Sequence, residues 1–182
     1  MVCKLFRDIF FPKYLRRNGF SPREVFISLK GLSNFRAFRS YHRLPHRPWR
    51  ILSAFFSRDA DADTELSCLA YALAQFPARA FRSISLCFPR YNLVRTEPLT
   101  ELLTALVPIQ CPNLTITASL TGKHDIDVHM PPVYTPMAWN LTNLTMEGNL
   151  NYTPFRPLLF GASQLLEELT LCSLGATSTS FQ

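Results

Sequence analysis

Glycine is scarce in this sequence, which excludes most motifs that cradle a phosphate group. Only 6 of the 182 residues are Gly, and no P-loop, GxGxxG or GxSxG pattern occurs. No HExxH sequence and no CxxC pair occurs either, so the common zinc-binding patterns are missing. Because no catalytic constellation remains, we expect a protein without enzymatic activity, catalytic residues, cofactor or bound metal.

Long hydrophobic runs are absent as well. No apolar stretch approaches the roughly 20 residues that a membrane-spanning helix needs. The apolar stretch 9–11 is bracketed by Asp8 and Lys13, and no small-residue cleavage site follows it, which is unlike a secretory signal. We therefore expect no association with a membrane.

The five Cys are an odd number, so they cannot all pair in disulfides. Cys68, Cys87 and Cys172 stand beside apolar residues, and we expect reduced thiols in or near the core. Reduced thiols favour a reducing compartment, so the expected location is cytoplasmic or nuclear.

Positive charge is concentrated at the start of the chain. Residues 1–50 hold twelve basic and two acidic residues, whereas residues 51–182 hold seven basic and eleven acidic ones. Such a segment is typical either of an ordinary solvated face or of binding to nucleic acid or another acidic surface. Arg and aromatic residues alternate around His42 and His46, which could suit RNA or phosphates. Nucleic acid is not the expected partner because no known nucleic-acid motif occurs; binding through the basic N-terminal third is the alternative hypothesis.

A short apolar pattern recurs in the later part of the chain. Its central residues Ile84, Leu114, Leu144 and Leu169 are spaced 30, 30 and 25 residues apart. Apolar residues occupy the first, fourth and sixth positions, which predicts short strands with one buried face, and the period predicts that the strands stack side by side. The four segments are 81–86 (FRSISL), 111–116 (CPNLTI), 141–146 (LTNLTM) and 166–171 (LEELTL).

Amphipathic helices are predicted before three of these strands. Apolar residues at i, i+3, i+4 and i+7 occur in 66–73, 99–106 and 155–162. Asp63 or Thr64 could cap the first of these helices. Pro98 suits the first position of the second helix, and Pro108 should end it.

The segment 21–64 is predicted to be mainly helical. A capping-box pattern at 21–24 predicts a helix that Gly31 ends, and residues 32–37 then suggest a weak strand. Residues 48–56 predict another helix with Trp49, Leu52, Phe55 and Phe56 facing inward, followed by a polar loop at 57–64.

Residues 121–139 carry no helical signal and form a long predicted connection. It contains the one dense group of potential metal ligands, His124, Asp125, Asp127 and His129. A polar strand or loop explains these residues without a metal, because no further ligand pattern flanks them.

The strand and helix pattern resembles a leucine-rich repeat, whose motif is roughly Leu-x-x-Leu-x-Leu-x-x-Asn/Cys-x-Leu. Asn149 matches the Asn position in the third segment, whereas the other three segments have Pro89, Ser119 and Leu174 there. The resemblance implies an α/β fold: an open horseshoe solenoid with parallel strands and outer helices, here after an N-terminal helical segment. The repeats would occupy 65–175, preceded by a basic helical linker or first irregular repeat at 21–64 and followed by a polar tail at 176–182.

The first residues are similar to the last helix of an F-box, and we assign 1–20 to such a remnant. The resemblance implies a substrate receptor of a ubiquitin ligase, with an unknown protein client as partner. No Leu-Pro-x-Glu stretch precedes Met1, so we expect a chain truncated within the F-box, for which the Skp-type adaptor is a doubtful partner. It would be a fragment, a truncated gene model or a decayed paralogue. The matching residues are Val2, Cys3, Phe6, Arg7, Asp8, Ile9 and Pro12.

The alternation of side chains along a strand predicts which residues would face a partner. They flank the inward apolar positions and would lie on the concave face of the solenoid. This candidate interface consists of Ser83, Ser85, Asn113, Thr115, Thr117, Asn143, Thr145, Glu147, Glu168 and Thr170.

Overall fold

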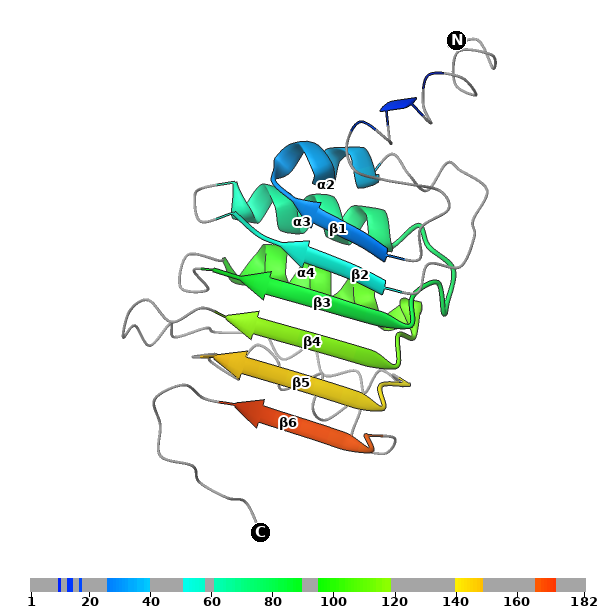
Figure 1. Cartoon of the computed structure of the whole chain (residues 1–182), viewed down its shortest axis with the longest axis vertical. Coiled ribbons are helices and arrows are strands. Elements are labelled where there is room, and N and C mark those ends of the chain that lie inside the picture. Colours follow the sequence, from blue (N-terminus) through cyan, green and yellow to red (C-terminus); the bar gives the residue numbers. More distant parts are fainter. Residues whose placement is uncertain are drawn as a thin grey trace.

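One parallel β-sheet organises the chain, and its six strands follow one another in sequence order (Figure 1). The computed structural model describes residues 10, 13–14, 17, 26–39, 51–57, 61–89, 95–118, 140–148 and 166–172. The strands are β1 (Phe26–Lys30), β2 (Ile51–Phe55), β3 (Ser83–Phe88), β4 (Asn113–Ala118), β5 (Asn143–Gly148) and β6 (Glu168–Cys172). The predicted α/β class with parallel strands is therefore correct.

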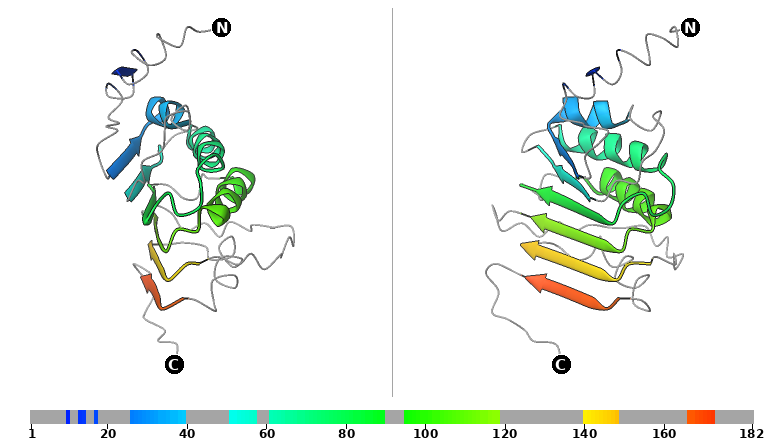
Figure 2. Two further views of the ribbon diagram at one scale, coloured as in Figure 1. Left: turned by 90° about the vertical axis from the view of Figure 1, so that its right-hand side faces the viewer. Right: turned by 45° about the vertical axis from the view of Figure 1, so that its right-hand side comes forward.

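Three helices lie together on one face of this sheet (Figure 2). They are α2 (Leu32–Arg39), α3 (Ala62–Leu73) and α4 (Thr96–Leu106), and a 3-10 turn, Val107–Ile109, follows α4. No helix of the described residues covers the opposite face of the sheet. Parallel sheets usually have helices on both faces, so it is distinctive that the described helices all lie on one face.

The prediction that the four strands stack side by side is confirmed by the pairing of their central residues. Ile84 is in register with Leu114, Leu114 with Leu144, and Leu144 with Leu169, each on the neighbouring strand. The same row extends backwards through Leu52 to Ile27. A second row, two residues further along each strand, consists of Leu29, Ala54, Leu86, Ile116, Met146 and Leu171.

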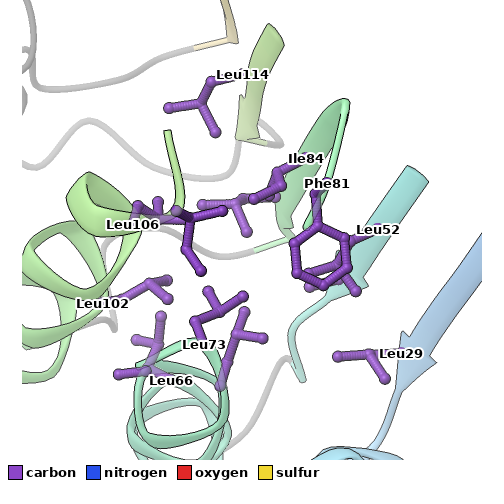
Figure 3. Close-up of a cluster of buried hydrophobic side chains, with 14 of the residues drawn as sticks. Leu29, Leu52, Leu66, Leu73, Phe81, Ile84, Leu102, Leu106 and Leu114 are labelled. Carbon is purple, nitrogen blue, oxygen red and sulfur yellow. The ribbon is translucent and has the colours of Figure 1, made fainter. Parts of the chain in front are cut away.

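From β1 to β5 these two rows are buried and form the core together with the apolar stripes of α3 and α4. Leu66 and Leu73 of α3 and Leu102 and Leu106 of α4 are fully buried. Figure 3 shows them directed toward side chains of the sheet such as Ile84. The i, i+3, i+4, i+7 spacing that predicted both helices is thus the spacing of their buried side chains.

Stacked phenylalanine rings extend the core at the first three strands. Phe56, directly after β2, stacks between Phe35 of α2 and Phe88 of β3, with ring centroids 5.3 and 4.6 Å away. Phe76 similarly lies between Phe38 and Phe81, with centroids 5.4 and 5.1 Å away. Stacked and tilted ring pairs at these distances stabilise the core beyond the effect of burying their apolar surface.

Backbone hydrogen bonds repeat at the entrance to the strands. The carbonyl of Pro112 accepts hydrogen bonds from the N–H groups of Thr142 and Asn143, at 2.9 and 3.0 Å. One unit later, the carbonyl of Thr142 accepts from Glu167 and Glu168, at 2.8 and 3.1 Å. The same bifurcated contact thus joins successive units and fixes their register.

The predictions for residues 26–55 were wrong about the type of each element. Residues 26–30 form strand β1 and not a helix, residues 32–39 form helix α2 and not a strand, and residues 51–55 form strand β2 and not a helix. For β1 the physical reason is a period of two: Ile27 and Leu29 are buried whereas Ser28 and Lys30 are exposed. Gly31, with φ of +80°, does not end a helix but turns the chain from β1 into α2.

The predicted helix caps were also wrong, although the helices themselves are present. Helix α3 begins one residue earlier than Asp63, with Asp61 as its N-cap. Helix α4 begins at Thr96, so Pro98 occupies the third helical position and not the first. The stop at Pro108 is confirmed, because the α-helix ends at Leu106.

Some expectations fall on residues that the structure does not describe. These are the third predicted helix at 155–162, the potential metal ligands of 124–129, and all seven residues that match the F-box helix. Within the first twenty residues, positions 10, 13, 14 and 17 are helical. Among the described residues, no helix is long and apolar enough to span a membrane.

Candidate interaction surface

The face of the sheet away from the helices brings the ten predicted partner-binding residues into three straight rows. Ser83, Asn113, Asn143 and Glu168 are in register across strands β3 to β6 and form the first row. The third row contains Thr117 and Glu147. We call this face, made of every second residue of the six strands, the open face.

The middle row of the open face consists of hydroxyl side chains on all six strands. Its members follow the register from strand to strand without interruption: Ser28, Ser53, Ser85, Thr115, Thr145 and Thr170. Neighbouring members are one strand spacing apart, about 4.8 Å. The result is a narrow uncharged strip that crosses the whole sheet at right angles to the strands.

Sequence reasoning missed the first two members of this hydroxyl row. Ser28 lies between Ile27 and Leu29, and Ser53 lies between Leu52 and Ala54. An apolar residue, a Ser or Thr, and another apolar residue therefore occur in sequence on each of the six strands. This triplet is the signal that could have found β1 and β2.

No side-chain hydrogen bond within the described part of the chain engages the hydroxyl row. Elsewhere on the open face, the side-chain amide of Asn113 donates to the carbonyl of Arg82 at 2.8 Å. Ser53 is buried, and Ser85, Thr115 and Thr145 are half-buried, yet their hydroxyls make no such contact. These groups can donate to and accept from an approaching partner.

The outer rows change in character from one end of the sheet to the other. On β2, Ile51 and Phe55 flank the hydroxyl row and are 38% and 42% exposed. On β5 and β6, the outer rows carry the exposed carboxylates of Glu147 and Glu168. The open face is therefore apolar toward β2, polar and uncharged across β3 and β4, and acidic toward β6.

The thiols divide between the core and the open face. Cys68 is buried, as predicted, whereas Cys87 is half-buried in the third row and Cys172 is exposed, so Cys172 is not a core thiol. Burial raises the pKa of Cys87. Burial also raises the pKa of Cys111 to about 11, and the Cys111 Sγ lies 3.2 Å from the carbonyl of Asn113. A raised pKa keeps these thiols protonated and weakly nucleophilic at neutral pH.

Two carboxylates outside the open face make structural contacts. Glu65 of α3 is buried and accepts hydrogen bonds from Ser57, at 2.7 Å from its N–H and 2.6 Å from its hydroxyl. Asp63 accepts from the backbone N–H of Arg95 at 3.1 Å and lies 3.3 Å from its Nε. Both contacts hold the start of a helix to a neighbouring segment. Among the described residues, no group of three His, Cys, Asp or Glu could hold a metal ion.

Comparison with protein families, with curated proteins and with solved structures finds no match for this chain.

Proposed function

We propose that this chain is a non-catalytic scaffold that binds a protein partner along its open face. The observation that carries the proposal is the row of six hydroxyl side chains from Ser28 to Thr170, of which Ser53 alone is buried. Small side chains let a partner's backbone approach the sheet closely, and hydroxyls can pair with its N–H and C=O groups.

We further propose that the fold is a leucine-rich-repeat solenoid that resembles the substrate-recognition part of an F-box ubiquitin-ligase receptor. In such solenoids each strand and helix unit buries its apolar face only against its neighbours. Two observations support this: the strands follow chain order, and the central residues of the last four strands are 30, 30 and 25 residues apart. Binding of the Skp-type adaptor itself is not part of the proposal.

The charges of the open face favour a protein over nucleic acid. The described positions of this face carry one cation, Lys30, and two anions, Glu147 and Glu168. Nucleic-acid binding depends on several cations placed against phosphates, which this face does not supply. The alternative hypothesis rests on the basic N-terminal third, of which the Arg-rich segment 40–50 lies outside the described residues.

Site-specific photocrosslinking tests the proposed surface directly. A benzophenone amino acid would replace Thr115 at the centre of the open face. The same group would replace Thr104 on α4 as a matched control, because Thr104 is exposed on the opposite side of the molecule. After irradiation in a lysate of the source cells, we expect discrete protein adducts from position 115 and not from position 104.

The double variant Thr115→Arg/Thr145→Arg identifies which adducts are specific. Two long cations in the hydroxyl row would block close approach, so a crosslinker at Ser85 should lose its adducts in this variant. Thr104→Arg should leave them unchanged. Adducts that are equal at both faces, adducts that survive the double variant, or none at all would each refute the proposed function.

A further inference from the structure

The two ends of the described sheet carry opposite charge. In residues 26–39 and 51–57, which form β1, α2 and β2, all charged side chains are basic: Lys30, Arg36 and Arg39. In residues 140–148 and 166–172, which hold β5 and β6, all charged side chains are acidic: Glu147, Glu167 and Glu168. One end of the molecule is therefore electrostatically complementary to the other.

The acidic end also exposes side chains that belong to core rows. Leu169 and Leu171 of β6 are 46% and 43% exposed. Every other member of their two rows is essentially inaccessible, including Leu144 and Met146 on the adjacent strand β5. The two apolar rows thus continue onto β6, where their last members are exposed. Exposed apolar side chains on an edge strand are typical of an association surface.

The outer edges of β1 and β6 are not paired with any described strand. We propose that a second copy of this chain binds there, with its β1 adding in parallel to β6 of the first copy. Keeping the register found between the other strands would place Ser28 beside Thr170. The hydroxyl row would then run on from one copy into the next.

The same register continues the core rows between the two copies. Ile27 and Leu29 of the second copy would lie beside Leu169 and Leu171, completing the rows that β6 leaves open. Backbone N–H and C=O groups on the outer edge of β6, which have no partner in the described sheet, would form hydrogen bonds with β1 of the second copy. Each of these matches follows from a single alignment of the two strands.

The charges fit this alignment as well. In the third row, Lys30 of the second copy would follow Cys172, which follows Glu147. Lys30 and Glu147 would then be two strand spacings apart, about 10 Å, so their long side chains can approach each other above Cys172. The contact is head-to-tail, so it leaves a free β6 edge on each added copy and permits open stacks.

A disulfide between copies tests the register. Lys30→Cys would place a thiol beside the native Cys172 of the next copy, at about 5 Å between Cα atoms, which a disulfide can span. Ser28→Cys is the matched control, because the same alignment places it about 8 Å from Cys172, too far for a disulfide. Within one copy, positions 30 and 172 lie at opposite ends of the sheet (Figure 1).

Mild oxidation of Lys30→Cys should give a ladder of dimers, trimers and larger species on a non-reducing gel. Wild type, Ser28→Cys and Lys30→Cys/Cys172→Ser should give none. Absence of the ladder at high protein concentration, equal ladders from Ser28→Cys, or a product that stops at the dimer would overturn the proposal.

Two charge-reversal variants, which need no disulfide formation, provide a second test of the association. Sedimentation velocity should show association that weakens roughly two- to fivefold in Lys30→Glu alone and in Glu147→Lys alone, the size expected for one exposed ion pair. Mixing the two variants should restore part of it, because each would offer the complementary end to the other. A monomer at all concentrations, or association that neither variant alters, would contradict a head-to-tail contact.

Discussion

Glu65 and Ser57 form a closed pair that ties the first turn of α3 to the end of β2. The two carboxylate oxygens of Glu65 accept the N–H and the hydroxyl of Ser57, at 2.7 and 2.6 Å. The carboxylate is inaccessible to solvent, so it depends on these two hydrogen bonds for the contacts that water would otherwise make. Sequence reasoning assigned Ser57 to a polar loop and gave Glu65 no role.

Replacing Glu65 by Ala should therefore destabilise the fold. The change removes both acceptors and leaves the N–H of Ser57 without its partner. Hydrogen bonds to charged groups contribute about 1.5–3 kcal/mol each, so we expect the free energy of unfolding to fall by about 2–4 kcal/mol. Urea denaturation followed by circular dichroism measures this difference.

Glu101→Ala is the matched control for Glu65→Ala. Glu101 is also on a helix, but it is exposed and its contact with the hydroxyl of Ser67 is long, 3.4 Å. Its removal should change the free energy of unfolding by no more than about 0.5 kcal/mol. Equal effects of the two substitutions would show that the pair formed by Glu65 and Ser57 has no special role.

Gly148 is required where β5 ends against β4. A Cβ atom built at this position would lie 1.8 Å from the carbonyl oxygen of Ala118, and the φ angle is +101°. Gly148→Ala should cost about 2–4 kcal/mol, because the clash with backbone adds to the strain of a positive φ. Thermal unfolding measures the loss as a lower Tm.

Gly31→Ala separates the two causes. Gly31 also has a positive φ, +80°, but a Cβ there would meet no atom within 4 Å. Only the conformational strain remains, and the expected cost is about 1 kcal/mol. If Gly31→Ala were as damaging as Gly148→Ala, the close approach to Ala118 would not explain the need for glycine.

The later strands could be predicted from the sequence because their pattern contains two signals at once. Leu114 and Ile116 alternate with Asn113 and Thr115, and the same alternation returns at a fixed distance along the chain. At β1 the apolar positions also fit a helix over a short window, and the preceding capping pattern favoured that reading. Only pairing with β2 selects the strand, and such a contact is not visible in a local window.

The open face could be predicted residue by residue for the same reason. Alternation alone places Thr115 and Thr145 opposite the core, and the register aligns them. The sequence did not reveal how far the hydroxyl row extends, because Ser28 and Ser53 lie on strands that were misassigned.

Leu114 and Leu169 occupy the same core row but should respond differently to truncation. Leu114 is 1% exposed between β3 and β5, whereas Leu169 is 46% exposed on β6. Leu114→Ala should lower the free energy of unfolding by about 2–5 kcal/mol because it leaves a cavity. Leu169→Ala should cost less than about 1 kcal/mol in dilute solution. Urea denaturation of the two variants at low protein concentration makes the comparison.

A large loss of stability in Leu169→Ala would contradict the exposure of the last strand. Repeating the measurement at high protein concentration distinguishes a role in association, because a contact between copies makes stability depend on concentration. The cost of Leu114→Ala should not depend on concentration, since its neighbours belong to the same chain.

Cys111 should make the fold sensitive to alkaline pH. Burial raises its pKa from 9.0 to about 11, so between these values the thiol is protonated in the folded chain and ionised in the unfolded one. The unfolded state then binds fewer protons, and stability falls as pH rises through this window. The contribution of this thiol is fully present below pH 9 and is lost as pH rises through about 11.

Cys111→Ala should flatten this alkaline loss, and Cys172→Ser should not, because Cys172 is exposed. The measurement is the free energy of unfolding between pH 8 and 10.5, determined from urea titrations with a reductant present. The quantity to compare is the slope of the free energy of unfolding against pH. The cavity left by Cys111→Ala lowers stability equally at every pH and does not alter this slope. An unchanged slope in Cys111→Ala would mean that this thiol ionises as readily in the folded chain as in the unfolded one, and its burial against β3 and β4 would then be incorrect.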